Sequence, residues 1–475
     1  MTEPLSGLLR PHSVAVFGAS ERLPDFVGTM QRLGFKGEIY PINPKYEQVH
    51  GIKSYPSIDS VPAAVEYAIF AVPAAAVPRL MDECAKKGVK LVHLYSGRFA
   101  ETGRPADAEL EREVLSKASK GGVRVMGPNC MGLYDPELGI SWTDDFPTEP
   151  GSVGLVSQSS YSAHDLVLTA ATRGLRFRKV IGFGNALDLN ECDFLDHLCE
   201  DPGTKVILMY IEGVKDGKRF FSSLRQASRV KPVIIAKGGR GEPGARAASS
   251  HTAALTGSPR TWKAAIRQAG GIPADGLEDL IDLAVTFTFL DRLSGLRVGI
   301  VCAGGGTGVM AADECEEAGL DVVPLPEEMR LEMRRKEIGI WDWVGNPIDM
   351  SIMAGTIMPG DSLAGDLAQM MARYPDFDLI IPVISELHQK RAQTGLAAEA
   401  YLRRFGIGKI EGKPVLAVVA EKGLDRAGYE DPASKMMAEV RTRLAATGIP
   451  VYPTVARAAR SAKTLADYCS RARDR

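Results

Sequence analysis

The chain has 475 residues, of which 45% are hydrophobic and 24% are charged, values that are ordinary for a folded globular protein. Its 57 basic and 59 acidic side chains leave a formal net charge of −2, which excludes the strongly basic surface of proteins that bind nucleic acids or anionic membranes. A chain of this length is expected to form about three domains.

The cysteines and the apolar segments predict a soluble, cytoplasmic protein. An odd number of isolated cysteines with no CxxC pair is typical of reduced thiols, and we expect no metal site. The N-terminus lacks the basic and apolar regions of a signal peptide, and no apolar run approaches the roughly 18–20 residues of a membrane span. The seven cysteines are Cys84, Cys130, Cys192, Cys199, Cys302, Cys315 and Cys469.

Short runs rich in valine and isoleucine alternate with longer amphipathic segments along the chain. Strands are expected at residues 13–18, 66–72, 90–96, 123–127, 152–157, 205–211, 231–237, 296–304, 378–385 and 413–420. Each run fits a fully buried strand of a parallel sheet, and the amphipathic segments between them fit helices. The pattern predicts an α/β fold in which a doubly wound sheet is repeated three times.

Two domain boundaries are expected. Residues 134–152 are rich in turn residues and contain three prolines, and a new strand begins at Leu296 after a long helical segment. The predicted domains are therefore residues 1–140, 141–294 and 295–475.

The first candidate site follows the first strand, in VAVFGASERLPDFVG (14–28). Small residues at Gly18 and Ser20 would let the backbone approach a phosphate, which the N–H groups of the next helix would bind. The GxGxxG fingerprint is absent because position 20 is serine. Taken alone, the segment fits a turn without a ligand equally well.

The second candidate site is the segment KPVIIAKGGRGEPGARAASSHTAALTGS (231–258), in which His251 is flanked by Ser249, Ser250 and Thr252. Small neighbours suit a histidine that bulky phosphates must reach. Histidine can attack phosphorus at neutral pH because much of it is unprotonated there. Local sequence alone favours the alternative, in which His251 caps a helix and neighbouring hydroxyls satisfy its ring.

A carboxylate stands at the end of another buried strand, in VILMYIEGVKDGKRF (206–220). Glu212 would lie at the carboxyl edge of the sheet, where α/β proteins place their sites. Beside an imidazole it would fix the tautomer and stabilise a positively charged ring. The alternative is that Glu212 caps the following turn.

Two further segments, residues 154–167 and 301–319, run from a strand through small residues into a helix. Each would aim backbone N–H groups at an anion. The predicted phosphate-binding residues are Ser157, Gln158, Ser159, Ser160, Gly304, Gly305, Gly306 and Thr307.

In order and spacing, these motifs resemble those of the NDP-forming acyl-CoA synthetases, the superfamily of the succinyl-CoA ligase α subunits. YPINPKYEQVHGIKSYPSI (40–58), FAVPAAAVP (70–78), YSGRFAETG (95–103) and GPNCMGLYDP (127–136) extend the resemblance to about residues 8–460. It implies a Rossmann-like CoA-binding domain followed by two flavodoxin-like domains. The positions that match CoA-binding residues are Gly18, Ser20, Pro41, Asn43, Lys45, Val72, Pro73, Ser96, Gly97 and Asn129, and Lys45 is the expected partner of a CoA phosphate.

The resemblance also implies roles for the other candidates. His251 falls in the phosphohistidine loop, usually SHTGALAG, where this chain has Ala253 and Thr256 instead of glycine and alanine. Glu212 matches the glutamate that supports this histidine, and the two phosphate loops would face it.

A second departure from the family is Ser160-Tyr161, where Gly-Ala is common. The tyrosine would lie near the acyl-phosphate site and affect which acid fits, or alternatively point into the core.

The reaction that the resemblance implies converts a small carboxylic acid, CoA and ATP to acyl-CoA, ADP and phosphate. No segment resembles an ATP-grasp module or a GxxxxGK[ST] loop. We therefore expect Mg-ATP to be bound by a separate ATP-grasp β subunit in a hetero-oligomer. The alternatives are a CoA-binding regulatory or scaffold protein and an NAD-dependent dehydrogenase, the latter disfavoured by the missing third glycine and ribose-binding acid.

Overall fold

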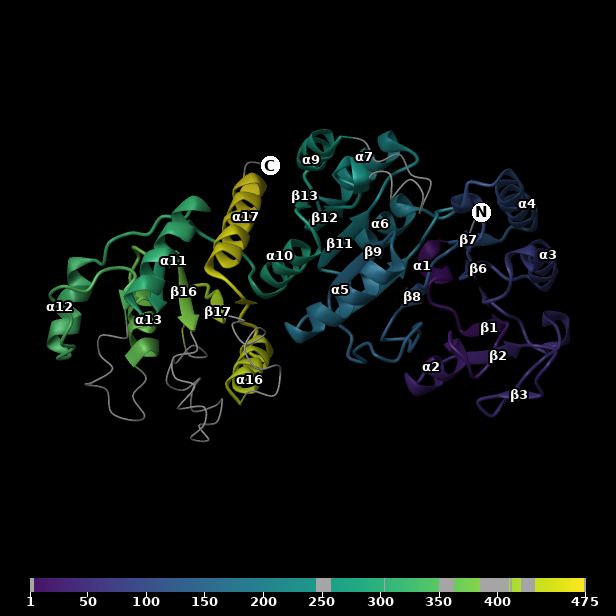
Figure 1. Cartoon of the computed structure of the whole chain (residues 1–475), viewed down its shortest axis with the longest axis horizontal. Helices are drawn as coiled ribbons and strands as arrows, with labels where there is room; N and C mark the ends of the chain where they lie inside the picture. The colour runs from purple at the N-terminus through teal and green to yellow at the C-terminus, as the bar shows by residue number, and fades with distance from the viewer. Residues whose placement is uncertain are drawn as a thin grey trace. The chain divides into compact units, whose positions relative to one another are not determined.

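The structure is a computed structural model that describes residues 4–244, 258–302, 304–349, 363–384, 410, 412–419 and 432–473 (Figure 1). The chain divides into two compact units. The first comprises residues 1–171 and 175–284, and the second comprises residues 172–174 and 285–475. Among the described residues, the first unit contains two large sheets and one two-stranded sheet, and the second unit contains one large sheet. The two domain boundaries expected from the sequence remain a prediction.

The first sheet of unit 1 is entirely parallel, with strand order β2-β1-β5-β6-β7. Its strands are β1 (Ser13–Phe17), β2 (Glu38–Ile42), β5 (Tyr67–Phe70), β6 (Leu91–Leu94) and β7 (Arg124–Met126). Its helices are α1 (Leu5–Leu8), α2 (Phe26–Arg32), α3 (Val77–Lys87) and α4 (Pro105–Gly121). Short 3₁₀ helices lie at Ile58–Ser60, Ala74–Ala76 and Ala100–Thr102, and a small hairpin joins β3 (Gln48–Val49) to β4 (Ile52–Lys53).

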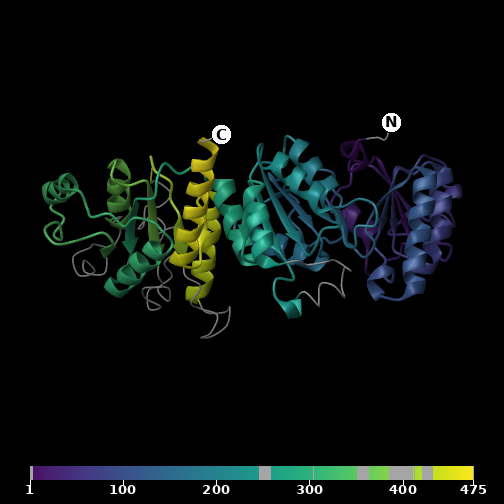
Figure 2. The ribbon, with the colours of Figure 1, turned by 90° about the horizontal axis from the view of Figure 1, so that it is seen from above.

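Helices α3 and α4 cover one face of this sheet, as Figures 1 and 2 show. In α3 the buried residues Val77, Leu80, Met81 and Cys84 recur every three or four positions, which places them on one side of the helix. They pack against the buried strands, and the apolar surface that they remove from water stabilises the layer.

The chain adds strands on both sides of β1. The next strand of this sheet, β2, pairs with one edge of β1, and β5 pairs with the other, so the direction in which the sheet grows reverses at β1. In open parallel sheets a ligand binds outside the carboxyl ends of the strands at such a reversal. The loops that follow β1, β2, β5, β6 and β7 all leave this one edge, so the fold positions a site there.

The second sheet of unit 1 has the order β13-β12-β11-β9-β10-β8. Its strands are β8 (Gly132–Tyr134), β9 (Val153–Ser157), β10 (Phe177–Gly182), β11 (Val206–Ile211), β12 (Val233–Lys237) and β13 (Ile272–Ala274). The helices around it are α5 (Ser160–Thr172), α6 (Glu191–Glu200), α7 (Gly217–Ala227), α9 (Pro259–Gln268) and α10 (Leu277–Phe289). All pairs are parallel except β10 with β8, which is antiparallel.

Side-chain contacts join the two sheets of unit 1. The guanidinium of Arg124, on β7, forms an ion pair of 2.8 Å with Asp188, which precedes α6. The amide of Asn185 donates a hydrogen bond of 2.7 Å to Glu101, in the loop after β6. These contacts explain why both sheets belong to one compact unit.

The sheet of unit 2 is parallel, with order β15-β14-β16-β17-β18. Its strands are β14 (Val298–Cys302), β15 (Ile348–Asp349), β16 (Leu379–Ile384), β17 (Ala417–Val419) and β18 (Val451–Tyr452). Its helices are α11 (Gly305–Glu317), α12 (Glu327–Arg335), α13 (Leu363–Arg373), α16 (Pro432–Ala446) and α17 (Val455–Arg473). Consecutive side chains of β14 point to opposite faces of the sheet. Ile300 packs on one face with α11 and α17, and Val301 packs on the other with α12 and α13.

The predicted α/β fold with parallel sheets is therefore confirmed, and the antiparallel edge strand β8 is an addition to it. None of the helices formed by the described residues has both the length and the apolar character needed to cross a membrane. The same residues hold no group of three or more His, Cys, Asp or Glu side chains placed to bind a metal ion.

Candidate functional site

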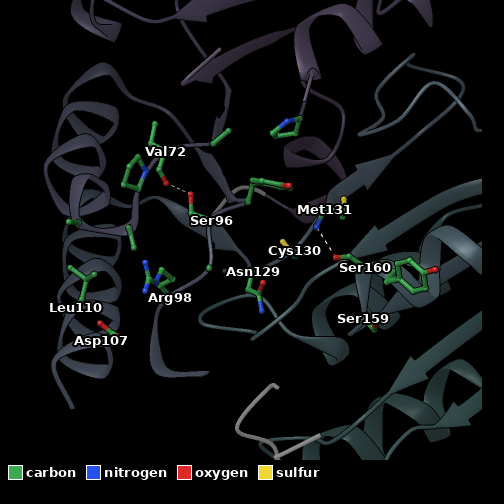
Figure 3. A pocket seen from close by; sticks show the side chains of 18 of the residues that line it. Val72, Ser96, Arg98, Asp107, Leu110, Asn129, Cys130, Met131, Ser159 and Ser160 are labelled. Atoms are coloured by element: carbon green, nitrogen blue, oxygen red, sulfur yellow. Dashed lines mark hydrogen bonds between the residues drawn. The ribbon is translucent and has the colours of Figure 1, made fainter. Parts of the chain in front are cut away.

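A cavity of about 980 Å³ lies at the carboxyl edge of the first sheet (Figure 3). Its wall is built from residues 71–75 after β5, 95–98 after β6, 129–131 after β7, and 158–161 at the junction of β9 and α5. Pro24 in the loop after β1, Arg104 just before α4, and Asp107 and Leu110 of α4 complete it. The cavity thus connects the loops of the first sheet with the start of a helix from the second.

Five of the ten predicted CoA-binding residues line this cavity: Val72, Pro73, Ser96, Gly97 and Asn129. The hydroxyl of Ser96 lies within hydrogen-bond distance of the carbonyl oxygens of Val72 and of Phe70, the latter at 3.2 Å, and its one proton is shared between them. The N–H of Asn129 donates to the carbonyl of Ser96 at 3.0 Å. These bonds hold the loops after β5, β6 and β7 together.

The other five, Gly18, Ser20, Pro41, Asn43 and Lys45, leave the same edge of the sheet from β1 and β2 but are not among the residues that line the cavity. The amide of Asn43 donates to the carbonyl of Ala19 at 2.9 Å, which links the two loops. Lys45, the expected phosphate partner, is exposed.

Gly18 brings the loop after β1 into direct contact with the cavity wall. Its φ of +79° lies in the left-handed region, and a Cβ atom built on it would lie 2.3 Å from the carbonyl oxygen of Ala71. Glycine is required here both for the backbone conformation and for the close approach of β1 to the end of β5.

The loop between β9 and α5 uses its side chains to hold its own shape. The hydroxyl of Ser157 donates to the carbonyl of Ser159 at 2.7 Å, and the hydroxyl of Ser159 accepts from the N–H of Ser162 at 3.3 Å, as in a helix N-cap. The hydroxyl of Ser160 accepts from the N–H of Met131 at 2.8 Å and so joins α5 to the loop after β7. An anion in this loop would therefore be bound through backbone N–H groups.

Gln158 connects this loop to the predicted carboxylate. Its side-chain oxygen accepts hydrogen bonds from the N–H groups of Glu212, at 2.7 Å, and Gly213, at 3.1 Å. Glu212 is buried, with 7% of its surface exposed, and the hydroxyl of Tyr210 donates to its carboxylate at 3.4 Å. The structure thus brings together two of the predicted site segments that are 54 positions apart in the chain.

Lys237, the last residue of β12, was not predicted as a site residue. Its side chain is buried, donates to the carbonyl of Glu212 at 2.6 Å, and stands 5.2 Å above the ring of Trp262. Burial lowers the pKa of Lys237 to about 8, and the nearby Glu212 carboxylate acts in the opposite direction. A lysine that ends an otherwise apolar strand, VIIAK, was the signal for it in the sequence.

His251, Ala253 and Thr256 lie outside the described residues, so the role of His251 remains a prediction. The predicted phosphate loop of unit 2 lies between β14 and α11. The N–H of Gly304 donates to the carboxylate of Asp349 at 2.8 Å, and Gly305, Gly306 and Thr307 form the first turn of α11. Their role in binding an anion remains a prediction.

Sequence reasoning also missed two arginines on the cavity wall, Arg98 and Arg104. Tyr161 lines the cavity as well, and 80% of its surface is exposed, so it does not point into the core.

Two protein-family models match the segments that form the two large sheets of unit 1. The family model described as a CoA binding domain matches residues 12–136, and the model described as a succinyl-CoA ligase like flavodoxin domain matches residues 150–287.

Relatives extend the match over nearly the whole chain. The α subunit of the ADP-forming acetate–CoA ligase II of Pyrococcus furiosus is 33% identical over 453 residues, which are 94% of this chain and 94% of that subunit. The ADP-forming acetate–CoA ligase I of Archaeoglobus fulgidus is 38% identical over 316 residues, which are 66% of this chain but 46% of that protein, so the match spans about half of the longer relative.

Among solved structures, the acetyl-coenzyme A synthetase 1 of Ca. Korarchaeum cryptofilum, in complex with phosphate and ADP, superposes with a TM-score of 0.79. It is 29% identical, and the match covers 100% of this chain and 98% of that one. The chain therefore belongs to the family of the ADP-forming acid–CoA ligases and corresponds to their α subunits.

Proposed function

We propose that the chain is the α subunit of an ADP-forming acyl-CoA synthetase, which converts a small carboxylic acid, CoA and ATP to acyl-CoA, ADP and phosphate. One observation carries this proposal: a single cavity joins the loops of the CoA-binding sheet to the loop before α5, and Gln158 of that loop is bonded to Glu212. The reactive end of CoA and a phosphate-binding loop would meet there.

CoA fits the residues that surround the cavity. Its phosphates would be bound by backbone N–H groups at the carboxyl edge of the first sheet and by cationic side chains. Its pantetheine arm would lie along Val72, Pro73 and Asn129, toward Ser160. When bound, CoA supplies the thiol that becomes the thioester.

The phosphoryl group would travel through His251 in three steps. An imidazole nitrogen attacks the terminal phosphorus of the nucleotide, so that an N–P bond forms and ADP leaves. The carboxylate of the acid then takes the phosphoryl group as an acyl phosphate, which returns the histidine to its free form. The thiolate finally attacks the acyl carbon and phosphate leaves. Dividing the transfer in this way keeps the phosphoryl energy in a covalent intermediate.

Glu212 would stabilise the phosphorylated imidazole, and Lys237 and Gln158 hold the backbone of Glu212 in place from two sides. A carboxylate beside an imidazole fixes the tautomer and favours the positively charged ring.

A separate ATP-grasp β subunit would bind Mg-ATP in a cytoplasmic hetero-oligomer. The Pyrococcus furiosus relative, which this chain covers almost completely, is named as an α subunit. The relatives are ligases, which favours the enzyme over the alternative of a CoA-binding regulatory or scaffold protein.

The test is phosphorylation of the chain by its ATP-grasp partner and radiolabelled Mg-ATP. Label that is labile in acid and stable in base should appear on the wild type and disappear in His251→Ala. His12→Ala is the matched control, because His12 lies on the surface before β1, and it should keep the label. Label that persists in His251→Ala would remove His251 from the mechanism.

A further inference from the structure

Arg98, on the wall of the cavity, has a backbone conformation that a side chain of its size rarely adopts. Its φ is +76°, in the left-handed region that favours glycine. Non-glycine residues held in this region concentrate at ligand-binding sites, where the surrounding structure enforces the conformation.

The loop around Arg98 is held by other residues. The carboxylate of Glu101 accepts hydrogen bonds from the N–H groups of Arg98, at 2.5 Å, and Phe99, at 3.1 Å. The Phe99 side chain is fully buried. The fold of this loop therefore uses the backbone of Arg98 and makes no use of its guanidinium.

The guanidinium of Arg98 has no hydrogen-bond or ion-pair partner among the described residues. It is exposed and lies on the α4 side of the cavity (Figure 3). The second arginine of the wall differs, because Arg104 forms an ion pair of 3.7 Å with Asp107. The cavity thus presents an unpartnered cation, and all five of the guanidinium N–H donors are open to a ligand.

We propose that Arg98 binds a phosphate of CoA. A guanidinium donates two parallel N–H groups to two oxygens of one phosphate, which makes arginine the side chain suited to this anion. Glycine at position 98 would remove the backbone strain of the positive φ angle, but it would also remove the positive charge. The inference rests on the proposed function, because it assumes that CoA occupies this cavity.

CoA carries phosphates in two places, the diphosphate that joins adenosine to pantetheine and the 3′-phosphate of the ribose. Calorimetric titration of the full chain with CoA and with dephospho-CoA, which lacks the 3′-phosphate, distinguishes them. Arg98→Gly should weaken CoA binding about 10- to 100-fold, the usual effect of losing a charge-assisted hydrogen bond. An effect on CoA alone assigns the 3′-phosphate, and an equal effect on both ligands assigns the diphosphate.

Stability provides the second readout. Arg98→Gly should melt at the same temperature as the wild type or higher, because glycine accepts a positive φ without strain. Arg98→Ala keeps the strain and loses the guanidinium, so it should lose as much affinity without the gain in stability. Arg79→Ala is the matched control for charge: Arg79 pairs with Glu83 on the surface of α3, and its removal should leave CoA affinity within about twofold.

CoA affinity that is unchanged in Arg98→Gly while the wild type binds CoA would overturn this inference and leave the proposed function intact. A wild-type chain that binds neither CoA nor dephospho-CoA would instead reject the CoA site itself.

Discussion

A methyl group at Gly18 is expected to push strands β1 and β5 apart beside the cavity in which we propose that CoA binds. The Cβ atom of Gly18→Ala would lie 2.3 Å from the carbonyl oxygen of Ala71, a separation shorter than any normal contact. That oxygen belongs to the backbone and cannot rotate away, and the N–H of Ala71 is itself bonded to Phe17 at 3.0 Å. The loop after β1 or residues 71–75 must therefore move, by roughly 1 Å.

Two effects determine the loss of stability. The left-handed backbone at φ +79° disfavours any side chain by about 1–2 kcal/mol, and overpacking against a rigid neighbour adds about 1–3 kcal/mol. Gly18→Ala should therefore lower the free energy of unfolding by about 2–5 kcal/mol. Gly88→Ala separates the two effects, because Gly88 ends α3 with φ +83° and has no atom within 4 Å of its added Cβ. The free energy of unfolding of Gly88→Ala should therefore fall by about 1–2 kcal/mol.

The assays are urea denaturation and calorimetric titration with CoA. A shift of this size at a binding site is expected to reduce the CoA affinity of Gly18→Ala about 10- to 100-fold. Gly88→Ala, on the far end of α3 from the cavity, should bind CoA as the wild type does. Equal losses of stability in both variants, or wild-type CoA affinity in Gly18→Ala, would refute the steric argument.

Three further predictions concern the second sheet and its site. Glu212→Gln should reduce turnover about 10- to 100-fold and leave CoA affinity unchanged, since it removes the charge that we propose stabilises the phosphorylated imidazole. The pKa of Lys237 is about 8 in the folded chain, which is lower than its pKa in the unfolded chain. At pH values between these two pKa values the unfolded state therefore binds more protons than the folded state. The free energy of unfolding should therefore gain a contribution of up to about 3 kcal/mol as the pH rises from 7 to 10, and urea denaturation of Lys237→Met should lack it. Lys179→Met should lower the free energy of unfolding by about 3–5 kcal/mol. The Asp135 carboxylate is 1% exposed and lies 3.1 Å from the Lys179 ammonium, so the substitution leaves a buried charge without its ion-pair partner.

Each of these has its own control or contrary outcome. Unchanged turnover in Glu212→Gln would mean that the carboxylate is only structural. An identical pH dependence in Lys237→Met would assign that dependence to other groups. Asp135→Asn added to Lys179→Met should recover part of the lost stability in a double-mutant cycle, and strictly additive losses would show that the two side chains are not coupled.

The fold class was readable from the sequence because it depends on local patterns. The run VILMYI forms β11 (Val206–Ile211) and is buried except at the half-buried Tyr210, and the apolar positions of α3 lie on one face as their spacing predicts. Buried parallel strands and amphipathic helices impose these patterns regardless of what they pack against. Strands with a weak pattern were missed: β8 has three residues, and β2 contains Pro41, which lacks the N–H of a strand residue.

The site depended on contacts that no local pattern contains. The chain showed Gln158, Glu212 and Lys237 at the ends of three strands, but the strand order β12-β11-β9 decided that they would be bonded to one another. The carboxylate of Glu101 accepts a hydrogen bond from the backbone of Arg98 and so sets the conformation of Arg98. Glycine is required at position 18 because the carbonyl of Ala71 lies so close to it. Periodicity reports which face of an element is buried, whereas hydrogen bonds and close approaches between strand ends arise only when tertiary structure places those ends side by side.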